Sequence, residues 1–209
     1  VAALTGAQVA SLSSTQLGAM ATADLKALST TALRALAADQ LSNLGTGQIA
    51  SLSTGQVAAL SATQLSGLST TNLTALGTAQ YAALGSAQVA ALTADQVANL
   101  QTADVAALSA GALRGLGVDA VAALTTAQVA ALTSGQLGAL TSTQIRALET
   151  ADVAAITTAN LKALAPAALA GLTAEQIGSL TTGQAAALST AQVAALGSLQ
   201  IAGLSTDNI

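Results

Sequence analysis

The chain has 209 residues, a formal net charge of -4, 7% charged residues, and neither His nor Cys. These absences remove the commonest general base, the thiolate nucleophile and the soft metal ligands, so the composition speaks against most catalytic and metal-binding proteins. Five Lys and Arg residues cannot neutralise a run of phosphates, and no apolar run approaches the roughly 18 residues of a membrane span, so we expect neither nucleic-acid binding nor membrane insertion.

An eight-residue unit, the octad, runs through the chain without insertion or deletion, and residues 125–132 (TTAQVAAL) show it cleanly. Counting in eights from Leu4, 24 of 26 positions are Leu. Counting in eights from Val1, 25 of 27 positions are Val, Leu or Ile. A fixed period of this kind predicts a repeat array rather than a set of globular domains. We expect one uninterrupted array over residues 1–209, about 25 complete octads, taken from a longer array.

Each octad carries its own predicted helix start, the first at Thr5 and the others every eight residues along the chain. The pattern is Ser or Thr followed three residues later by Gln, which is the capping box of a helix N-terminus. The Leu before the cap can pack on the Val-row residue of the next helix as a hydrophobic staple, and the following Ala pair favours helix. The sequence therefore predicts one very short, two-turn helix per octad.

Proline, glycine and the charged residues fit this frame. Pro166 falls at a first helical position, and Gly recurs at the cap position, where we expect it to help end the preceding helix. The acids fall at caps or in first turns and the bases toward helix C-termini, as the helix dipole favours. The acids are Asp24, Asp39, Asp95, Asp104, Asp119, Glu149, Asp152, Glu175 and Asp207; the bases are Lys26, Arg34, Arg114, Arg146 and Lys162.

Two places depart from the consensus. Tyr81, the sole aromatic residue, is predicted to be a size variant in the Val row rather than a binding platform. In residues 102–124, Ala replaces Gln at Ala112 and Ala120, and Val118 occupies a polar position. Asp104 with Asp119, or Glu149 with Asp152, could lie close together, although no pattern pairs these acids. We therefore assign no catalytic, cofactor-binding or metal-ligating residue.

The fold class predicted is an all-α solenoid of short helices. One continuous helix is excluded, because eight residues would advance the apolar stripe by about 80° per octad and no face would form. A β-solenoid remains the alternative, although spacings of three and five and the Ala-rich unit disfavour strands. The block Thr-Ala-Asp begins at residues 22, 102 and 150, separations that are multiples of 16.

This parity predicts two octads, or 16 residues, per coil. About 12 such coils, stacked at the spacing of packed helices, would make a rod on the order of 110 Å long. Three or four octads per turn would instead give a shorter and thicker object.

Residues 124–132 (LTTAQVAAL) resemble the octapeptide-repeat arrays of very large bacterial surface or secreted, adhesin-like proteins, and the likeness covers the whole chain. The resemblance implies a stalk, fibre or spacer at the cell surface or outside the cell.

We therefore expect a non-enzymatic structural protein without cofactor or small-molecule substrate. Its small, uncharged exterior of Ala, Ser, Thr, Gly and Gln can pack closely at little desolvation cost, which predicts a homo-oligomer or filament. The alternative is a binding module whose ranked Ser and Thr residues contact ice or a polysaccharide.

Overall fold

The computed structural model describes residues 3–204, and within this range every regular element is an α-helix of four to six residues. The all-α solenoid is thus confirmed, and no strand occurs among the described residues. The helices are α1 (Gly6–Ala10), α2 (Ser14–Gly18), α3 (Thr22–Ala27), α4 (Thr30–Arg34), α5 (Ala38–Ser42), α6 (Thr46–Ser51), α7 (Thr54–Ala59), α8 (Ala62–Ser66), α9 (Thr70–Thr74), α10 (Thr78–Ala82), α11 (Ser86–Val89), α12 (Ala94–Ala98), α13 (Thr102–Ala107), α14 (Ala110–Leu113), α15 (Val118–Ala122), α16 (Thr126–Ala130), α17 (Ser134–Ala139), α18 (Ser142–Arg146), α19 (Thr150–Ala155), α20 (Thr158–Leu161), α21 (Pro166–Leu169), α22 (Ala174–Gly178), α23 (Thr182–Ala186), α24 (Thr190–Ala194) and α25 (Ser198–Gly203).

The predicted capping box starts the helices. At α16, the Thr125 hydroxyl accepts from the backbone N–H of Gln128 at 3.3 Å, and Gln128 Oε1 accepts from the backbone N–H of Thr125 at 2.8 Å. The helices end at or just before the Leu row, and Leu60, the C-cap of α7, has φ -59° and ψ 141°. Because the chain is already extended there, the helices contain four to six residues, and the prediction of two full turns was too long.

Charge and proline placement follow the prediction where they can be seen. Pro166 opens α21, and eight of the nine acids lie at caps or in first turns, whereas Asp207 lies outside the described residues. The expected role of Gly in ending helices is wrong. Gly45 and Gly85 have φ of -67° and -90°, close to the values of Ser and Thr caps, and no residue of the described chain has positive φ.

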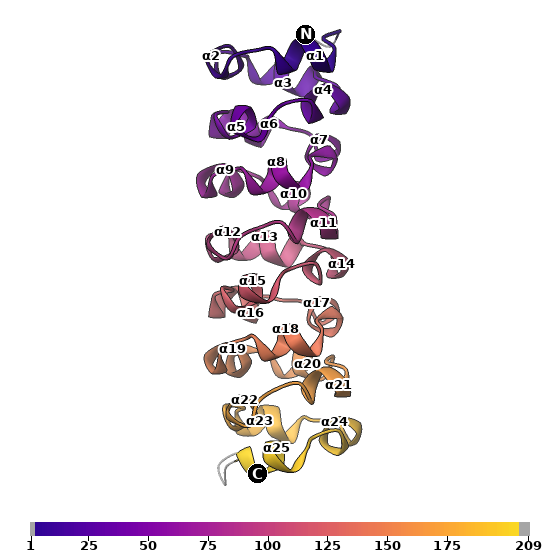
Figure 1. Ribbon diagram of the computed structural model, residues 1–209. Helices are drawn as coiled ribbons and strands as arrows, with labels where there is room; N and C mark the ends of the chain where they lie inside the picture. The colour runs from indigo at the N-terminus through magenta and orange to yellow at the C-terminus, as the bar shows by residue number, and fades with distance from the viewer. Residues whose placement is uncertain (1–2, 205–209) are drawn as a thin grey trace.

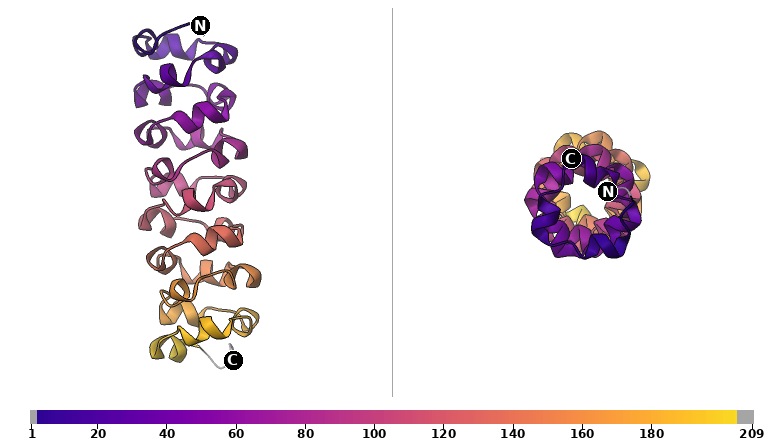
Figure 2. Two further views of the ribbon diagram at one scale, coloured as in Figure 1. Left: turned by 90° about the vertical axis from the view of Figure 1, so that its right-hand side faces the viewer. Right: turned by 90° about the horizontal axis from the view of Figure 1, so that it is seen from above.

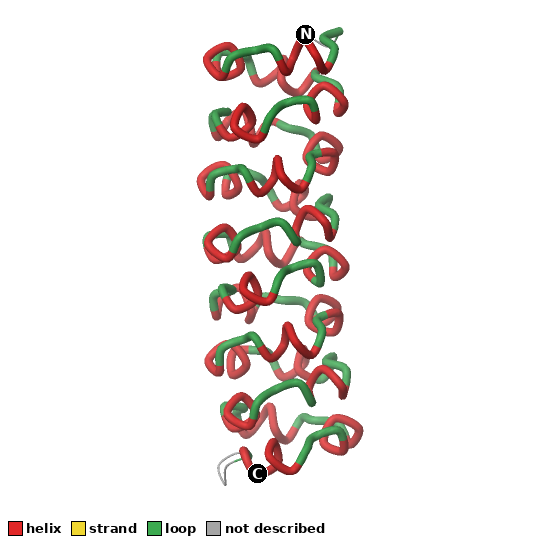
Figure 3. Tube along the Cα trace, viewed as in Figure 1, coloured by secondary structure: helices red, strands yellow, loops and turns green. Residues whose placement is uncertain are grey.

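The helices wind into one continuous coil with between three and four octads per turn. Nearly all helices pack beside the helix three places away in the chain, as α16 does with α13 and α19. Hydrogen bonds also reach the helix four places earlier, as from Gln128 of α16 to Leu100 at the end of α12. Figures 1 and 2 show the elongated coil with the described ends at opposite poles, and Figure 3 shows helices and short loops alternating throughout.

The prediction of two octads per coil was wrong, and the backbone at the links explains why. Two octads per turn would require the chain to reverse direction at each link. The link residues are instead extended, for example Leu60 (φ -59°, ψ 141°) and the cap Ser61 (φ -70°, ψ 159°). An extended pair redirects the chain by less than half a rotation, so the coil takes more octads to close.

The Leu row and the Val row fill the inside of the coil. Their side chains form one continuous core through the described chain, with Leu65, Val97 and Leu137 nearly or wholly inaccessible to solvent. Between turns, the residue before each Leu meets the first helical residue 29 positions earlier, and both positions hold small side chains. At Gly171 an added Cβ would lie 2.8 Å from the carbonyl oxygen of Ser142. Small residues therefore set the distance between turns.

Candidate functional site

The recurrent polar feature of the described octads is a glutamine that links two turns of the coil. Gln56 Oε1 accepts from the backbone N–H of Ser53 at 2.8 Å, which caps its own helix. Gln56 Nε2 donates to the carbonyl oxygens of Leu25 at 3.0 Å and Leu28 at 2.9 Å, which belong to the preceding turn of the coil. The side chain is 3% exposed. Both ends of one amide are thus satisfied, which a buried polar group requires.

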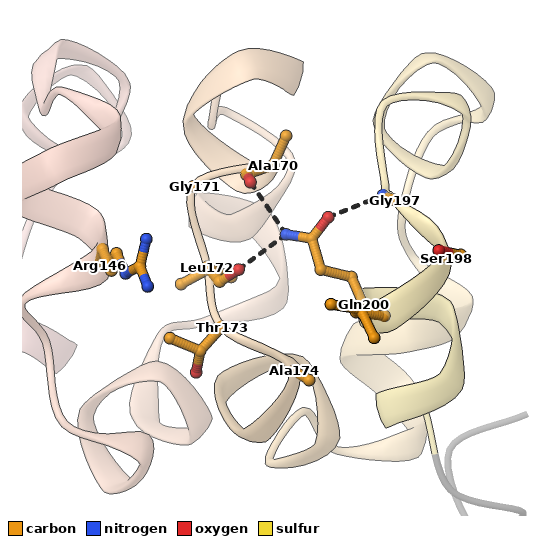
Figure 4. Close-up of a pocket in the computed structure, with 10 residues that line it drawn as sticks. Arg146, Ala170, Gly171, Leu172, Thr173, Ala174, Gly197, Ser198 and Gln200 are labelled. Carbon is orange, nitrogen blue, oxygen red and sulfur yellow. Dashed lines mark hydrogen bonds between the residues drawn. The ribbon is translucent and has the colours of Figure 1, made fainter.

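The same arrangement recurs along the coil, and we call it the glutamine ladder. Each member donates to the carbonyl oxygen of the Leu-row residue 28 positions earlier, at 2.6 to 2.9 Å in most cases; Met20 and Ile156 are the two members of this row that are not Leu. Figure 4 shows it at Gln200, whose Nε2 reaches Ala170 and Leu172 while Oε1 faces Gly197. The members are Gln40, Gln48, Gln56, Gln64, Gln80, Gln88, Gln96, Gln128, Gln136, Gln144, Gln176, Gln184, Gln192 and Gln200.

The sequence interpretation assigned these glutamines to capping alone and missed their second contact. One signal could have found it. Glu serves a capping box as well as Gln does, yet Glu is absent from all 26 positions of this column. Glu lacks a donor, so its absence indicates that the Nε2 group is needed. Asn72 fills the role too, because its Nδ2 donates to the carbonyls of Ser42 and Leu44 at 3.0 and 3.1 Å.

Asp104 interrupts the ladder. It occupies the glutamine column on α13 and is 3% exposed, and its Oδ2 is buried without a hydrogen-bond partner. Burial raises the pKa of this carboxyl group. Asp152 occupies the same column on α19 in an identical helix sequence, yet it accepts from the Thr126 hydroxyl at 2.8 Å and from the backbone N–H of Glu149 at 3.1 Å. Asp104 is therefore the unusual member of the column.

Two neighbours supply donors that Asp104 cannot. The buried Tyr81 hydroxyl donates to the carbonyl of Leu73 at 2.9 Å, and Gln101 Nε2 donates to the carbonyl of Thr74 at 3.0 Å. These carbonyls lie 31 and 30 residues before Asp104, where a ladder glutamine would donate. Burial, and secondarily the charge of Asp104, raises the pKa of Tyr81. Tyr81 is thus a size variant of the Val row, as predicted, and also a donor, which was not.

The two acid pairs that the sequence left open are arranged differently in the coil. Glu149 and Asp152 share the start of α19, where the contact is a backbone N–H donating to Asp152. Asp104 is on α13, which packs against α10 and α16, whereas Asp119 is on α15. Within residues 3–204, no group of three or more acidic, His or Cys residues could hold a metal ion, and no helix is long and apolar enough to cross a membrane.

Open grooves lie between turns of the coil. One of about 450 Å³ is lined by Arg146, Gly171, Thr173, Gly197 and Gln200 among others (Figure 4), and another lies beside Lys26 at the equivalent position of an earlier turn. Each has one basic residue and otherwise small or neutral ones. They are the spaces between successive turns and bring no reactive groups together.

The Ser and Thr column considered for lattice binding caps helices. The hydroxyls of Ser53, Thr125 and Thr173 accept from the Gln N–H of their own helix. Because successive octads turn around the axis, this column winds about the rod, whose outline from above is round (Figure 2). The hydroxyls therefore do not form one flat rank.

Comparison with known proteins identifies the repeat. The family model described as the ALTTAQ repeat matches five stretches, residues 17–54, 70–102, 97–134, 130–165 and 153–190. Together these stretches cover well over half of the chain. No curated protein matches the sequence.

Proposed function

The chain belongs to the ALTTAQ repeat family, and we propose that it is a non-enzymatic spacer whose coil sets a length and associates with copies of itself into filaments. The observation that carries the proposal is the glutamine ladder. Each turn is tied to the next by buried amides such as Gln56 and Gln136, in addition to the apolar core. A repeat whose neighbours are joined at every octad holds its length, because stability in such arrays is a sum of nearest-neighbour terms.

In the first described turn, two ladder donors have no acceptor within residues 3–204. Gln8 and Gln16 cap their helices through Oε1 at 2.9 and 2.8 Å, but their side chains are exposed and their Nε2 groups meet no acceptor in residues 3–204. The Leu-row residues Leu4, Leu12 and Met20 are only partly buried beside them. This surface has the donors and apolar side chains that an earlier turn would satisfy.

The last turn offers the complementary surface. Val193 and Ile201 of the Val row are 44% and 43% exposed, and an apolar hollow of about 330 Å³ opens between Ala185, Leu188 and Leu196. No side-chain donor within residues 3–204 reaches the carbonyls of Leu188 and Leu196. Since Gln8 and Gln16 are eight residues apart, as are these carbonyls, a second copy could continue the ladder in register. Where such turns form the ends of a rod, the partner we propose for this surface is a second copy of this chain, stacked end to end; where the array continues, further octads of the same chain fill it.

Sedimentation analysis of the 209-residue protein over a dilution series, with electron microscopy of the same samples, tests the proposal. We expect concentration-dependent end-to-end assemblies that the double variant Val193→Ser with Ile201→Ser abolishes. Gln8→Ala with Gln16→Ala should weaken association by about tenfold, as the loss of one or two hydrogen bonds implies. Val118→Ser is the matched control, because Val118 is an exposed apolar residue on the side of the coil.

The outcomes separate the two parts of the proposal. Uniform single rods at all concentrations would contradict self-association and leave the spacer role. Loss of assembly in Val118→Ser but not in Val193→Ser with Ile201→Ser would replace end-to-end stacking by lateral contact. A flexible-chain profile in small-angle scattering would contradict the spacer itself.

We also propose that the spacer works outside a bacterial cell, as a stalk or fibre. Support comes from the resemblance of residues 124–132 to arrays of bacterial surface proteins, and from a surface with few charges and no Cys to depend on the redox state. Antibody labelling of intact and permeabilised source cells tests this. Labelling that requires permeabilisation would contradict it.

A further inference from the structure

Asp104 stands where the ladder needs a donor. Its counterparts donate to the Leu carbonyl 28 residues earlier, which for Asp104 is that of Leu76. No side-chain donor within the described chain reaches this carbonyl. The two other carbonyls of this turn, those of Leu73 and Thr74, receive Tyr81 and Gln101 instead. One acceptor and one buried carboxyl oxygen are thus left without side-chain partners where α13 meets the preceding turn, a contact that we call the joint.

The reach of Asp104 is established by Asn72, which has the same length and the same column position. Asn72 Nδ2 donates to the carbonyl of Leu44, 28 residues earlier, at 3.1 Å. Asn160 Nδ2 reaches the carbonyl of Leu132, again 28 residues earlier, at 2.6 Å. A terminal atom of Asp104 can therefore contact Leu76 if it carries a hydrogen. A neutral carboxylic acid has such a hydrogen, whereas a carboxylate has none.

No nearby cation favours the ionised form. The helices packed on α13 are α10 and α16. The residue Gln101, which precedes α13, also contacts α9 of the preceding turn through its hydrogen bond to Thr74. Tyr81 of α10 is the one titratable or charged residue in these three helices, and its hydroxyl donates to Leu73. The helix α17 of the following turn, whose Gln136 donates to Leu108 at the end of α13, contains no titratable or charged residue. An ionised Asp104 would thus face carbonyl oxygens without compensation, which is unfavourable.

We propose that Asp104 is a protonation-dependent switch that controls one contact between turns of the coil. When the carboxyl group is protonated, it donates to the carbonyl of Leu76 and completes the ladder between α13 and the preceding turn. When it is ionised, the bond is lost and the two oxygens repel, so the joint between α9, α10 and α13 opens more readily. The rod therefore has one point at which acidity tightens it, and this holds whether or not the coil associates with copies of itself.

Tyr81 provides a probe of this switch, because it is the sole aromatic residue of the chain and lies in the joint. Its fluorescence would be recorded from about pH 3 to pH 8, around the ordinary Asp pKa of about 3.9. We expect one transition with a midpoint above about 3.9. Asp104→Asn should abolish the transition, since its amide donates at every pH. Asp152→Asn, in the same column with its carboxylate satisfied, should retain it.

Amide hydrogen exchange gives the second measurement. Between the unfolded pKa of about 3.9 and the midpoint, local opening of α13 in the wild type should rise by up to about tenfold per pH unit relative to Asp104→Asn, which is the slope expected for release of one proton, and above the midpoint the ratio should level off. The helix α19 should show no such rise, because Asp152 has partners.

Three results would overturn the proposal. A midpoint at or below about 3.9 would mean that Asp104 is held as an anion, for example by Thr78 in the manner in which Thr126 holds Asp152. A transition that persists in Asp104→Asn would belong to another group. A midpoint that falls when Ca²⁺ is added would mean that a cation, rather than a proton, occupies the joint.

Discussion

Gln128 and Leu100 are 28 residues apart in the sequence, yet Gln128 Nε2 donates to the Leu100 carbonyl oxygen at 2.8 Å. The same Gln128 accepts from the backbone N–H of Thr125 through Oε1. One side chain therefore both starts its own helix and holds the preceding turn. This double role explains how helices of four to six residues, which are unstable alone, persist in the coil.

Gln128→Glu should be strongly destabilising although Glu supports a capping box. The substitution keeps the acceptor for Thr125 but removes the donor to Leu100 and buries a charge, so we expect a loss of about 3 kcal/mol or more in the free energy of unfolding. Gln8→Glu is the matched control, since the exposed Gln8 side chain donates to no acceptor within residues 3–204 and its replacement should change stability little. Urea denaturation measures both, and equal effects would contradict the ladder.

Gly171→Ala should destabilise the coil and Gly183→Ala should stabilise it. A Cβ at Gly171 would lie 2.7 Å from the Ser142 Cβ, so the turns must move apart at a cost of about 1 to 3 kcal/mol. A Cβ at Gly183 meets nothing within 4 Å, and Ala there gains about 0.5 to 1 kcal/mol from helix propensity. Opposite shifts in thermal midpoint are expected; shifts of the same sign would contradict the contact between turns.

Tyr81→Phe should cost less stability when Asp104 is replaced by Gln. In the wild type, the Tyr81 hydroxyl is the donor to the Leu73 carbonyl, and its removal should cost about 1 kcal/mol. A Gln at position 104 would donate to that carbonyl, as Gln48 donates to Leu17 at 2.9 Å. A double-mutant cycle measures this coupling, and additive effects would show that the two residues do not share an acceptor.

The stability difference between the wild type and Asp104→Asn should depend on pH in the direction opposite to that of most acids. Burial raises the pKa of Asp104 above its unfolded value, so its stabilising contribution is complete below the unfolded pKa of about 3.9 and is lost as pH rises through the folded value. The wild type should therefore weaken relative to Asp104→Asn between acid and neutral pH. Denaturant midpoints across this range check the sign.

The described coil should be shorter than two octads per turn would make it. With three to four octads per turn and turns at the spacing of packed helices, a single rod should be about 60 to 80 Å long. Small-angle scattering of a dilute sample measures this length. A value near the 110 Å expected for 16-residue coils would contradict the structure.

Local features could be predicted from the sequence because their causes are local. Thr125 and Gln128 lie within one helix start, and Pro166 needs only its own torsion angle. The number of octads per turn depends instead on the torsion angles of links such as Leu60 and Ser61, which no single octad displays. The spacing of the Thr-Ala-Asp blocks misled for this reason, because a repeat of sequence need not match a turn of the coil.

The candidate site was missed for a related reason. Asp95 and Asp104 both look like acids placed to favour a helix dipole. They differ by one position in the helix. Asp95 is the second residue of α12 and is exposed, whereas Asp104 is the third residue of α13 and is buried against the preceding turn. Their environments diverge only once the coil places Leu73 and Leu76 beside the third position.

A turn that takes more than three but fewer than four octads couples the length of this rod to its orientation. Adding or removing one octad lengthens or shortens the rod by a fraction of a turn and swings whatever is attached to its end around the axis by between a quarter and a third of a full circle. Changes in octad number can therefore aim a neighbouring domain in a new direction while leaving its distance almost unaltered. Natural variation in repeat number would then adjust the bearing of such a domain as well as its reach.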